Sequence, residues 1–100
     1  LPAGSGGEEF RAAVEYMWLP RLMDFKPQMM IFSAGFDAHY EDDMGGLKLL
    51  EKDYAWCTEQ IKKVADIHAE GRIVSMLEGG YVMSALARSV GAHLRALSGI

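Results

Sequence analysis

The chain has 100 residues, of which 50% are hydrophobic and 24% are charged, and its formal net charge is −4. This composition is typical of a globular protein rather than a disordered one, and the length allows one domain at most. The negative charge argues against nucleic acid as a partner. No apolar run reaches the roughly 18 residues that a membrane span requires, so we expect no membrane partner.

The sequence also bears on cellular location. The N-terminal stretch, Leu-Pro-Ala-Gly-Ser-Gly-Gly, has neither the basic nor the apolar region of a signal peptide. The single cysteine, Cys57, excludes an internal disulfide and fits a reducing compartment, so we expect a cytoplasmic protein. The chain does not begin with methionine, which suggests a segment of a longer reading frame.

The first half of the chain predicts a helix followed by a strand. Apolar residues recur at three- and four-residue spacing from Phe10 to Phe25, with Trp18 on the stripe expected to enter the core. Pro20 interrupts this pattern, which predicts a kink or two short helices. The run from Met29 to Phe32 then has the length of a parallel strand that is buried on both faces.

The second half predicts helix, strand and helix again. A helix is expected from Lys52 to Ala69, a strand from Arg72 to Leu77, and a last helix with its apolar stripe from Leu86 to Leu97. The α-β-α-β-α order calls for parallel crossovers and an α/β fold. Two strands make a small sheet with open edges, which predicts self-association. Cys57, His68 and His93 fall on apolar helical faces, where we expect a buried thiol and hydrogen-bonded core histidines.

Polar residues gather just past the first predicted strand. Asp37 and His39 follow it directly, and the acidic run from Glu41 to Asp43 comes next. Ligands bind at the carboxyl ends of strands in open α/β sheets, so this segment is a candidate metal or acid–base site. The alternatives are a turn-capping role for Asp37 and a solvated loop for the acidic run.

Two blocks of this sequence resemble zinc-dependent histone deacetylases. The segment from Phe32 to Ala38 reads Phe-Ser-Ala-Gly-Phe-Asp-Ala, and Asp42 to Gly46 follows it at the spacing of the family's Asp-Pro-Leu-Gly-Gly. Leu77 to Tyr81, Leu-Glu-Gly-Gly-Tyr, resembles the family's Gly-Gly-Tyr turn. The likeness is to the class II type and its bacterial relatives, which include acetylpolyamine amidohydrolases. It implies that residues 1–100 form the C-terminal portion of an arginase-like, three-layer α/β domain with parallel strands, and an incomplete catalytic domain.

The resemblance also implies roles for individual residues. Asp37 matches one of three zinc ligands, whose two partners come from an upstream Asp-x-His pair that this chain lacks. Tyr81 matches the tyrosine that donates a hydrogen bond to the substrate carbonyl, and Met44, Gly79 and Gly80 match positions along the substrate path. The implied reaction is hydrolysis of acetyl-lysine or an acetylpolyamine by zinc-activated water. The family's adjacent histidine pair is missing, so the chain alone is expected to be inactive and to hold zinc weakly.

Two other interpretations remain open at this point. Asp37-Ala38-His39 itself has Asp-x-His spacing, so His39 is a second candidate ligand, although the resemblance places it beside the site rather than on the metal. A different class of protein is a non-catalytic α/β binding module that holds Mg²⁺ through Asp37, Asp42 and Asp43, as phosphoacceptor domains do. Those domains use a lysine at a later strand end, where this chain has Gly79-Gly80-Tyr81.

Overall fold

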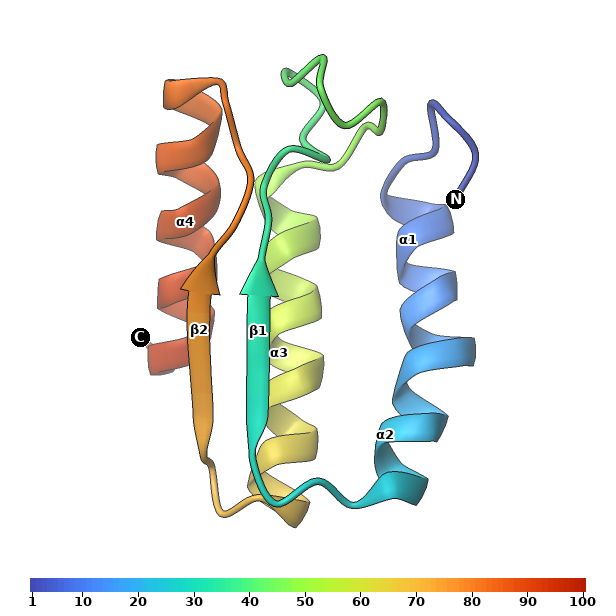
Figure 1. The fold of residues 1–100 in the computed structure, drawn as a ribbon, viewed down its shortest axis with the longest axis vertical. Coiled ribbons are helices and arrows are strands. Elements are labelled where there is room, and N and C mark those ends of the chain that lie inside the picture. Colours follow the sequence, from blue (N-terminus) through green and yellow to red (C-terminus); the bar gives the residue numbers. More distant parts are fainter.

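A computed structural model describes all 100 residues and contains helices and two strands in the expected order (Figure 1). The elements are α1 (Gly7–Ala13), η1 (Val14–Trp18), α2 (Leu19–Phe25), β1 (Met30–Ala34), α3 (Glu51–His68), β2 (Ile73–Leu77) and α4 (Met83–Ser98). Each lies within a few residues of the range expected from the sequence. None of the helices combines the length and the apolar character needed to cross a bilayer.

The two strands form a parallel pair whose ends lie level. Met30 lies opposite Ile73 at one end, and Ala34 lies opposite Leu77 at the other. Helix α3 connects the strands and packs against α4 behind the sheet. The first helical stretch, which consists of α1, η1 and α2, lies beside β1 (Figure 1). The α/β fold with parallel strands is therefore confirmed. The level register places the segments that follow β1 and β2 at the same edge.

The core consists of two apolar clusters on the helix side of the sheet. One joins the first helical stretch and β1 to α3, and its buried members are Val14, Met30, Cys57, Ile61, Ala65 and Ala69. The other lies under the carboxyl end of β1 and contains Ala34, Phe36, Leu49 and Tyr54. Burial raises the pKa of the Cys57 thiol to about 11, so this cysteine is the buried, unreactive residue that its helical position predicted.

The first helical stretch is divided into two short helices, α1 and α2, as Pro20 predicted, but no break in the chain direction separates them. The helix continues through the proline, but the turn before it widens into the π-helical segment η1, where the Leu19 N–H bonds to the carbonyl of Val14. Pro20 thus lies in the first turn of α2, where its missing N–H leaves no gap in the ladder. The predicted core position of Trp18 is wrong, because its side chain is 50% exposed and touches Phe10 edge-on.

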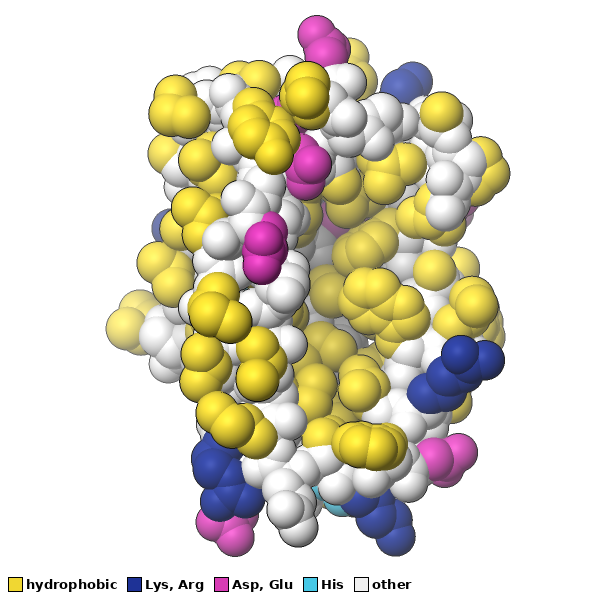
Figure 2. Space-filling model, viewed as in Figure 1, with side chains coloured by type: hydrophobic (Ala, Val, Ile, Leu, Met, Phe, Trp, Pro, Cys, Tyr) yellow, Lys and Arg dark blue, Asp and Glu magenta, His cyan; other side chains and the backbone are white.

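The front face of the sheet is open, which contradicts the expectation that the strand predicted at Met29 to Phe32 is buried on both faces. Ile31 on β1 is 62% exposed and Met76 on β2 is 52% exposed. Figure 2 shows this face with a hollow lined by hydrophobic side chains. A groove of about 510 Å³ runs between β1 and the first helical stretch, with Trp18 and Ile31 among its lining residues. The apolar runs thus predicted the two strands correctly, but this chain covers only one of their faces.

The open face and the two unpaired strand edges lead to a prediction for the 100-residue chain in solution. It should self-associate, because association covers apolar surface and pairs free backbone groups. Sedimentation velocity over a concentration series should show a weight-average mass that rises with concentration. A compact monomer at every concentration would contradict this expectation.

Candidate active site

Asp37 and Gly79 meet where the two strands end. The Phe36 N–H donates to the Gly79 carbonyl at 2.8 Å, so the segments beyond β1 and β2 stay paired. A Cβ atom on Gly79 would lie only 2.9 Å from Cγ and Oδ1 of Asp37. Glycine at position 79 therefore leaves room for the Asp37 carboxylate, a packing role that the sequence did not reveal.

The Asp37 carboxylate is chemically available. None of the hydrogen bonds in the chain ends on it, and the residue is only half-buried. A carboxylate oxygen that lies in a glycine-lined space and has no protein donor suits a hard or borderline cation such as Zn²⁺. However, the chain brings together no set of three His, Cys, Asp or Glu side chains that could hold a metal. The residues present therefore fit one ligand position of a zinc site and no more.

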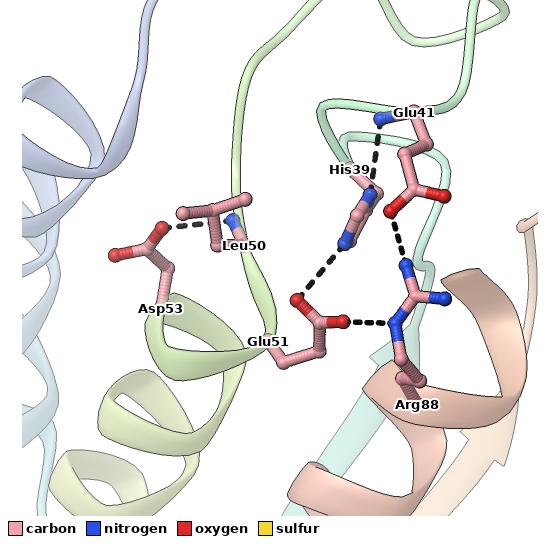
Figure 3. Close-up of polar contacts among 6 residues, drawn as sticks. All are labelled: His39, Glu41, Leu50, Glu51, Asp53 and Arg88. Carbon is pink, nitrogen blue, oxygen red and sulfur yellow. Dashed lines mark hydrogen bonds and ion pairs between the residues drawn. The ribbon is translucent and has the colours of Figure 1, made fainter. Parts of the chain in front are cut away.

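His39 is not available as a second ligand. It is 1% exposed, its Nδ1 accepts the Glu41 N–H at 3.0 Å, and its Nε2 lies 3.1 Å from Glu51 Oε2 (Figure 3). Since Nδ1 accepts a hydrogen bond, the proton is on Nε2, which donates to the Glu51 carboxylate. Both ring nitrogens are thus occupied. His39 is a buried anchor of the acidic loop, neither a ligand nor a rim residue.

A charged cluster that sequence reasoning missed surrounds His39. The Arg88 guanidinium from α4 donates to Glu51 at the start of α3 and to Glu41 in the acidic loop (Figure 3). The hydrogen bond from Arg88, followed by further contacts that include His39, lowers the pKa of Glu51 to about 2. The cluster joins the loop to the first residue of α3, Glu51, and to the second turn of α4, where Arg88 lies. Its members lie far apart in sequence, so no local pattern could have revealed it.

Asp42 links the acidic loop to the Gly-Gly-Tyr turn. It is 4% exposed, its Oδ2 accepts the Tyr81 N–H at 2.8 Å, and its Oδ1 accepts the Met44 N–H at 2.9 Å. These backbone donors, first Tyr81 and then Met44, lower the pKa of Asp42. The solvated-loop interpretation is therefore wrong for Asp42, although it describes the exposed Asp43. The proposed Mg²⁺ site also fails, because Asp37, Asp42 and Asp43 do not come together as a group that could hold a metal ion.

The remaining candidate residues, Met44, Gly80 and Tyr81, lie at the same edge of the sheet. Tyr81 is 59% exposed and Met44 is 73% exposed. Gly80 has a backbone φ of +134°, which residues with a side chain rarely adopt. A Cβ atom at this position would also lie 2.7 Å from Leu86 Cδ1. Gly80 therefore lets the chain turn and pack closely against α4, while Tyr81 and Met44 face solvent.

Three further side chains, those of His93, His68 and Tyr54, have polar atoms buried inside the chain. His93 is buried between Ser75 Oγ, 2.8 Å from Nε2, and Thr58 Oγ1, 2.7 Å from Nδ1, as expected for a hydrogen-bonded core histidine. The same expectation is wrong for His68, whose buried Nε2 has no partner. The Tyr54 hydroxyl is also buried without a partner, and its pKa is raised by burial and by negative charge, first that of Asp37.

Known proteins resemble this chain in structure and in sequence. The crystal structure of the HDA15 HD domain superposes with a TM-score of 0.90 and 28% sequence identity, over 98% of this chain and 27% of that one. Type-2 histone deacetylase 2 of Dictyostelium discoideum is 50% identical over 82 residues, which are 79% of this chain and 5% of the relative. Histone deacetylase 14, chloroplastic, of Arabidopsis thaliana is 38% identical over 99 residues, which are 99% of this chain and 23% of the relative.

Residues 1–97 match the family model of the histone deacetylase domain. The chain belongs to the histone deacetylase family, as the two sequence blocks indicated. It spans 5% and 23% of the lengths of the two relatives above, so it carries a minor part of such proteins.

Proposed function

We propose that this chain is the C-terminal part of a zinc-dependent deacetylase domain that hydrolyses N-acetylated amines. The observation that supports this most directly is the edge shared by the two strand ends. There the unpartnered Asp37 carboxylate lies against Gly79, two residues before the exposed Tyr81. One strand end thus offers a metal ligand and the other a hydrogen-bond donor. Metal-assisted amide hydrolysis uses both, the metal to polarise the carbonyl and the donor to stabilise the oxyanion.

Each residue has a defined part in this proposal. Asp37 supplies one oxygen ligand for Zn²⁺, and Gly79 keeps the space beside that ligand clear. When bound, zinc polarises the amide carbonyl and lowers the pKa of water to about 7. Tyr81 donates its hydroxyl proton in a hydrogen bond to the carbonyl oxygen as negative charge develops there. Met44 offers a flexible apolar surface for the alkyl chain that carries the acetylated amine.

The family supports a proposal for the substrate class. The relatives above are named histone deacetylases, which supports acetyl-lysine as the substrate, and an acetylpolyamine is the alternative with the same reacting group. Both present an amide on a flexible alkyl chain, which the exposed Met44 and Tyr81 could contact along one path. The single cysteine supports a cytoplasmic location for the protein.

The proposal is tested by comparing the 100-residue chain with a complete domain that contains it. The chain alone should show no deacetylation and, by calorimetry, no zinc site tighter than about micromolar, because one carboxylate cannot hold the metal. The complete domain should release acetate from an acetyl-lysine peptide or from an acetylpolyamine, and a chelator should abolish this activity. A complete domain that is zinc-loaded and folded but hydrolyses neither substrate would disprove the proposal. Nanomolar zinc binding by the chain alone would show that Asp37 has ligand partners within it.

A further inference from the structure

The backbone before Tyr81 has little intrinsic stiffness. Two glycines precede the tyrosine, and Gly80 adopts φ +134. Glycine has the widest conformational freedom of all residues, so the Gly-Gly turn by itself does not fix the direction of the next side chain. Helix α4 begins only at Met83, so Tyr81 also lies outside the helix. Contacts from elsewhere in the fold must therefore fix the position of Tyr81.

Asp42 makes such a contact. Its Oδ2 accepts the Tyr81 N–H at 2.8 Å, across 39 residues of sequence. A charged acceptor makes a stronger hydrogen bond than a neutral one, and at 4% exposure water competes little for this carboxylate. The other oxygen, Oδ1, is occupied by the Met44 N–H at 2.9 Å, which fixes the rotation of the carboxylate group.

Asp42 is itself held by the rest of the loop. Its N–H donates to the His39 carbonyl at 3.0 Å, and the buried His39 ring is bonded to Glu51 on α3. Arg88 adds the ion pairs to Glu41 and Glu51. The Tyr81 main chain is thus attached, through one carboxylate, to the N-terminal halves of the packed helices α3 and α4.

We infer that Asp42 is a positioning residue for deacetylation, which holds the Tyr81 main chain so that the phenol meets the carbonyl oxygen in the transition state. This inference rests on the function proposed above. An error of about 1 Å in the placement of a catalytic group can cost about a hundredfold in rate. Loss of the Asp42–Tyr81 bond should therefore lower turnover while the tyrosine hydroxyl is still present.

The test uses Asp42→Asn in the complete, zinc-loaded domain. The local bond to the Met44 N–H is of the Asx-turn kind that asparagine also makes, so the amide NH₂ should face the Tyr81 N–H, where no acceptor remains. We expect kcat to fall by about tenfold to a hundredfold, with KM and zinc content changed much less. The matched control is Asp43→Asn, which removes the same charge from the exposed neighbouring residue and should leave kcat unchanged.

A double variant separates positioning from a general structural role. If Asp42 acts through Tyr81, then Asp42→Asn should cost little further turnover when Tyr81 is already phenylalanine, because the hydroxyl to be positioned is gone. Effects that multiply in the double variant would overturn the inference, and so would an Asp42→Asn enzyme with normal kcat. If Tyr81→Phe itself keeps normal turnover, the proposed role of Tyr81 fails and the inference fails with it. A loss for Tyr81→Phe without one for Asp42→Asn would reject the inference alone.

Protein stability is monitored with a second substitution. In Asp42→Ser, a short hydroxyl can keep the turn to Met44 but cannot reach the Tyr81 N–H, so it should show the same loss of kcat. Folding of both variants is followed by circular dichroism and thermal unfolding. If both unfold under assay conditions, Asp42 serves the stability of the domain rather than the placement of Tyr81, and the inference is wrong.

Discussion

Replacing Asp37 by alanine in the complete domain should remove zinc and deacetylation together. The carboxylate has no protein donor to satisfy, so its loss leaves no unpaired buried partner, and the fold should tolerate the change. Substitutions that only support a metal ligand cost about tenfold to a hundredfold in metal affinity, so loss of a ligand should cost at least about a hundredfold. Zinc content by atomic emission and acetate release should fall in parallel, while the thermal unfolding of the metal-free protein stays near that of the parent.

Asp43→Ala is the matched control for this change. It removes an exposed carboxylate six residues further along the same loop, and this carboxylate has no hydrogen-bond partner in the chain. Zinc content and turnover should both remain normal. An Asp37→Ala domain that keeps full zinc occupancy would show that Asp37 is not a ligand. It would favour the alternative role of Asp37, which is turn capping.

Replacing Tyr81 by phenylalanine should lower turnover by about a hundredfold or more, which corresponds to roughly 2.7 kcal/mol. The substitution removes only the hydroxyl and leaves the main-chain bond to Asp42 intact. The lost hydrogen bond matters most when the carbonyl oxygen carries negative charge, so the transition state should suffer more than the bound substrate. We therefore expect a large fall in kcat, a small change in KM, and unchanged zinc content.

The control for Tyr81→Phe is Tyr40→Phe. Tyr40 is 63% exposed in the acidic loop, and its N–H pairs with the Leu49 carbonyl whatever the side chain carries. This change should have no effect on kcat. Near-normal turnover of the Tyr81→Phe enzyme on its true substrate would reject the oxyanion role and leave Tyr81 as an exposed turn residue.

Much of the fold could be predicted because it depends on local patterns. The spacing of apolar residues located α3 and α4, and the apolar runs located both strands to within a few residues. The burial of Cys57 followed from its place on the helical stripe. The π-helical widening before Pro20 was not predictable, because it depends on which carbonyl each N–H reaches rather than on the apolar pattern.

The candidate site could be predicted only in part. The two blocks around Asp37 and Tyr81 identified the family from the sequence, and the fold brings both blocks to one edge. The roles of the residues in the acidic run could not be predicted, because the sequence alone does not distinguish adjacent carboxylates that differ in burial and in hydrogen bonding. Only the structure separates the buried Asp42, bound to two backbone donors, from the exposed Asp43.

The sequence by itself thus determined the element order, the parallel strands and the family, since these depend on periodicity and on short motifs. Tertiary structure decided the partner of each polar group. His39 is a buried anchor rather than a ligand because Glu51 and the Glu41 N–H reach its ring, and Gly79 matters because the Asp37 carboxylate occupies the space of its absent side chain. Such contacts join residues distant in the chain. They depend on how the strand ends and helices meet in space, which a pattern of neighbouring residues does not contain.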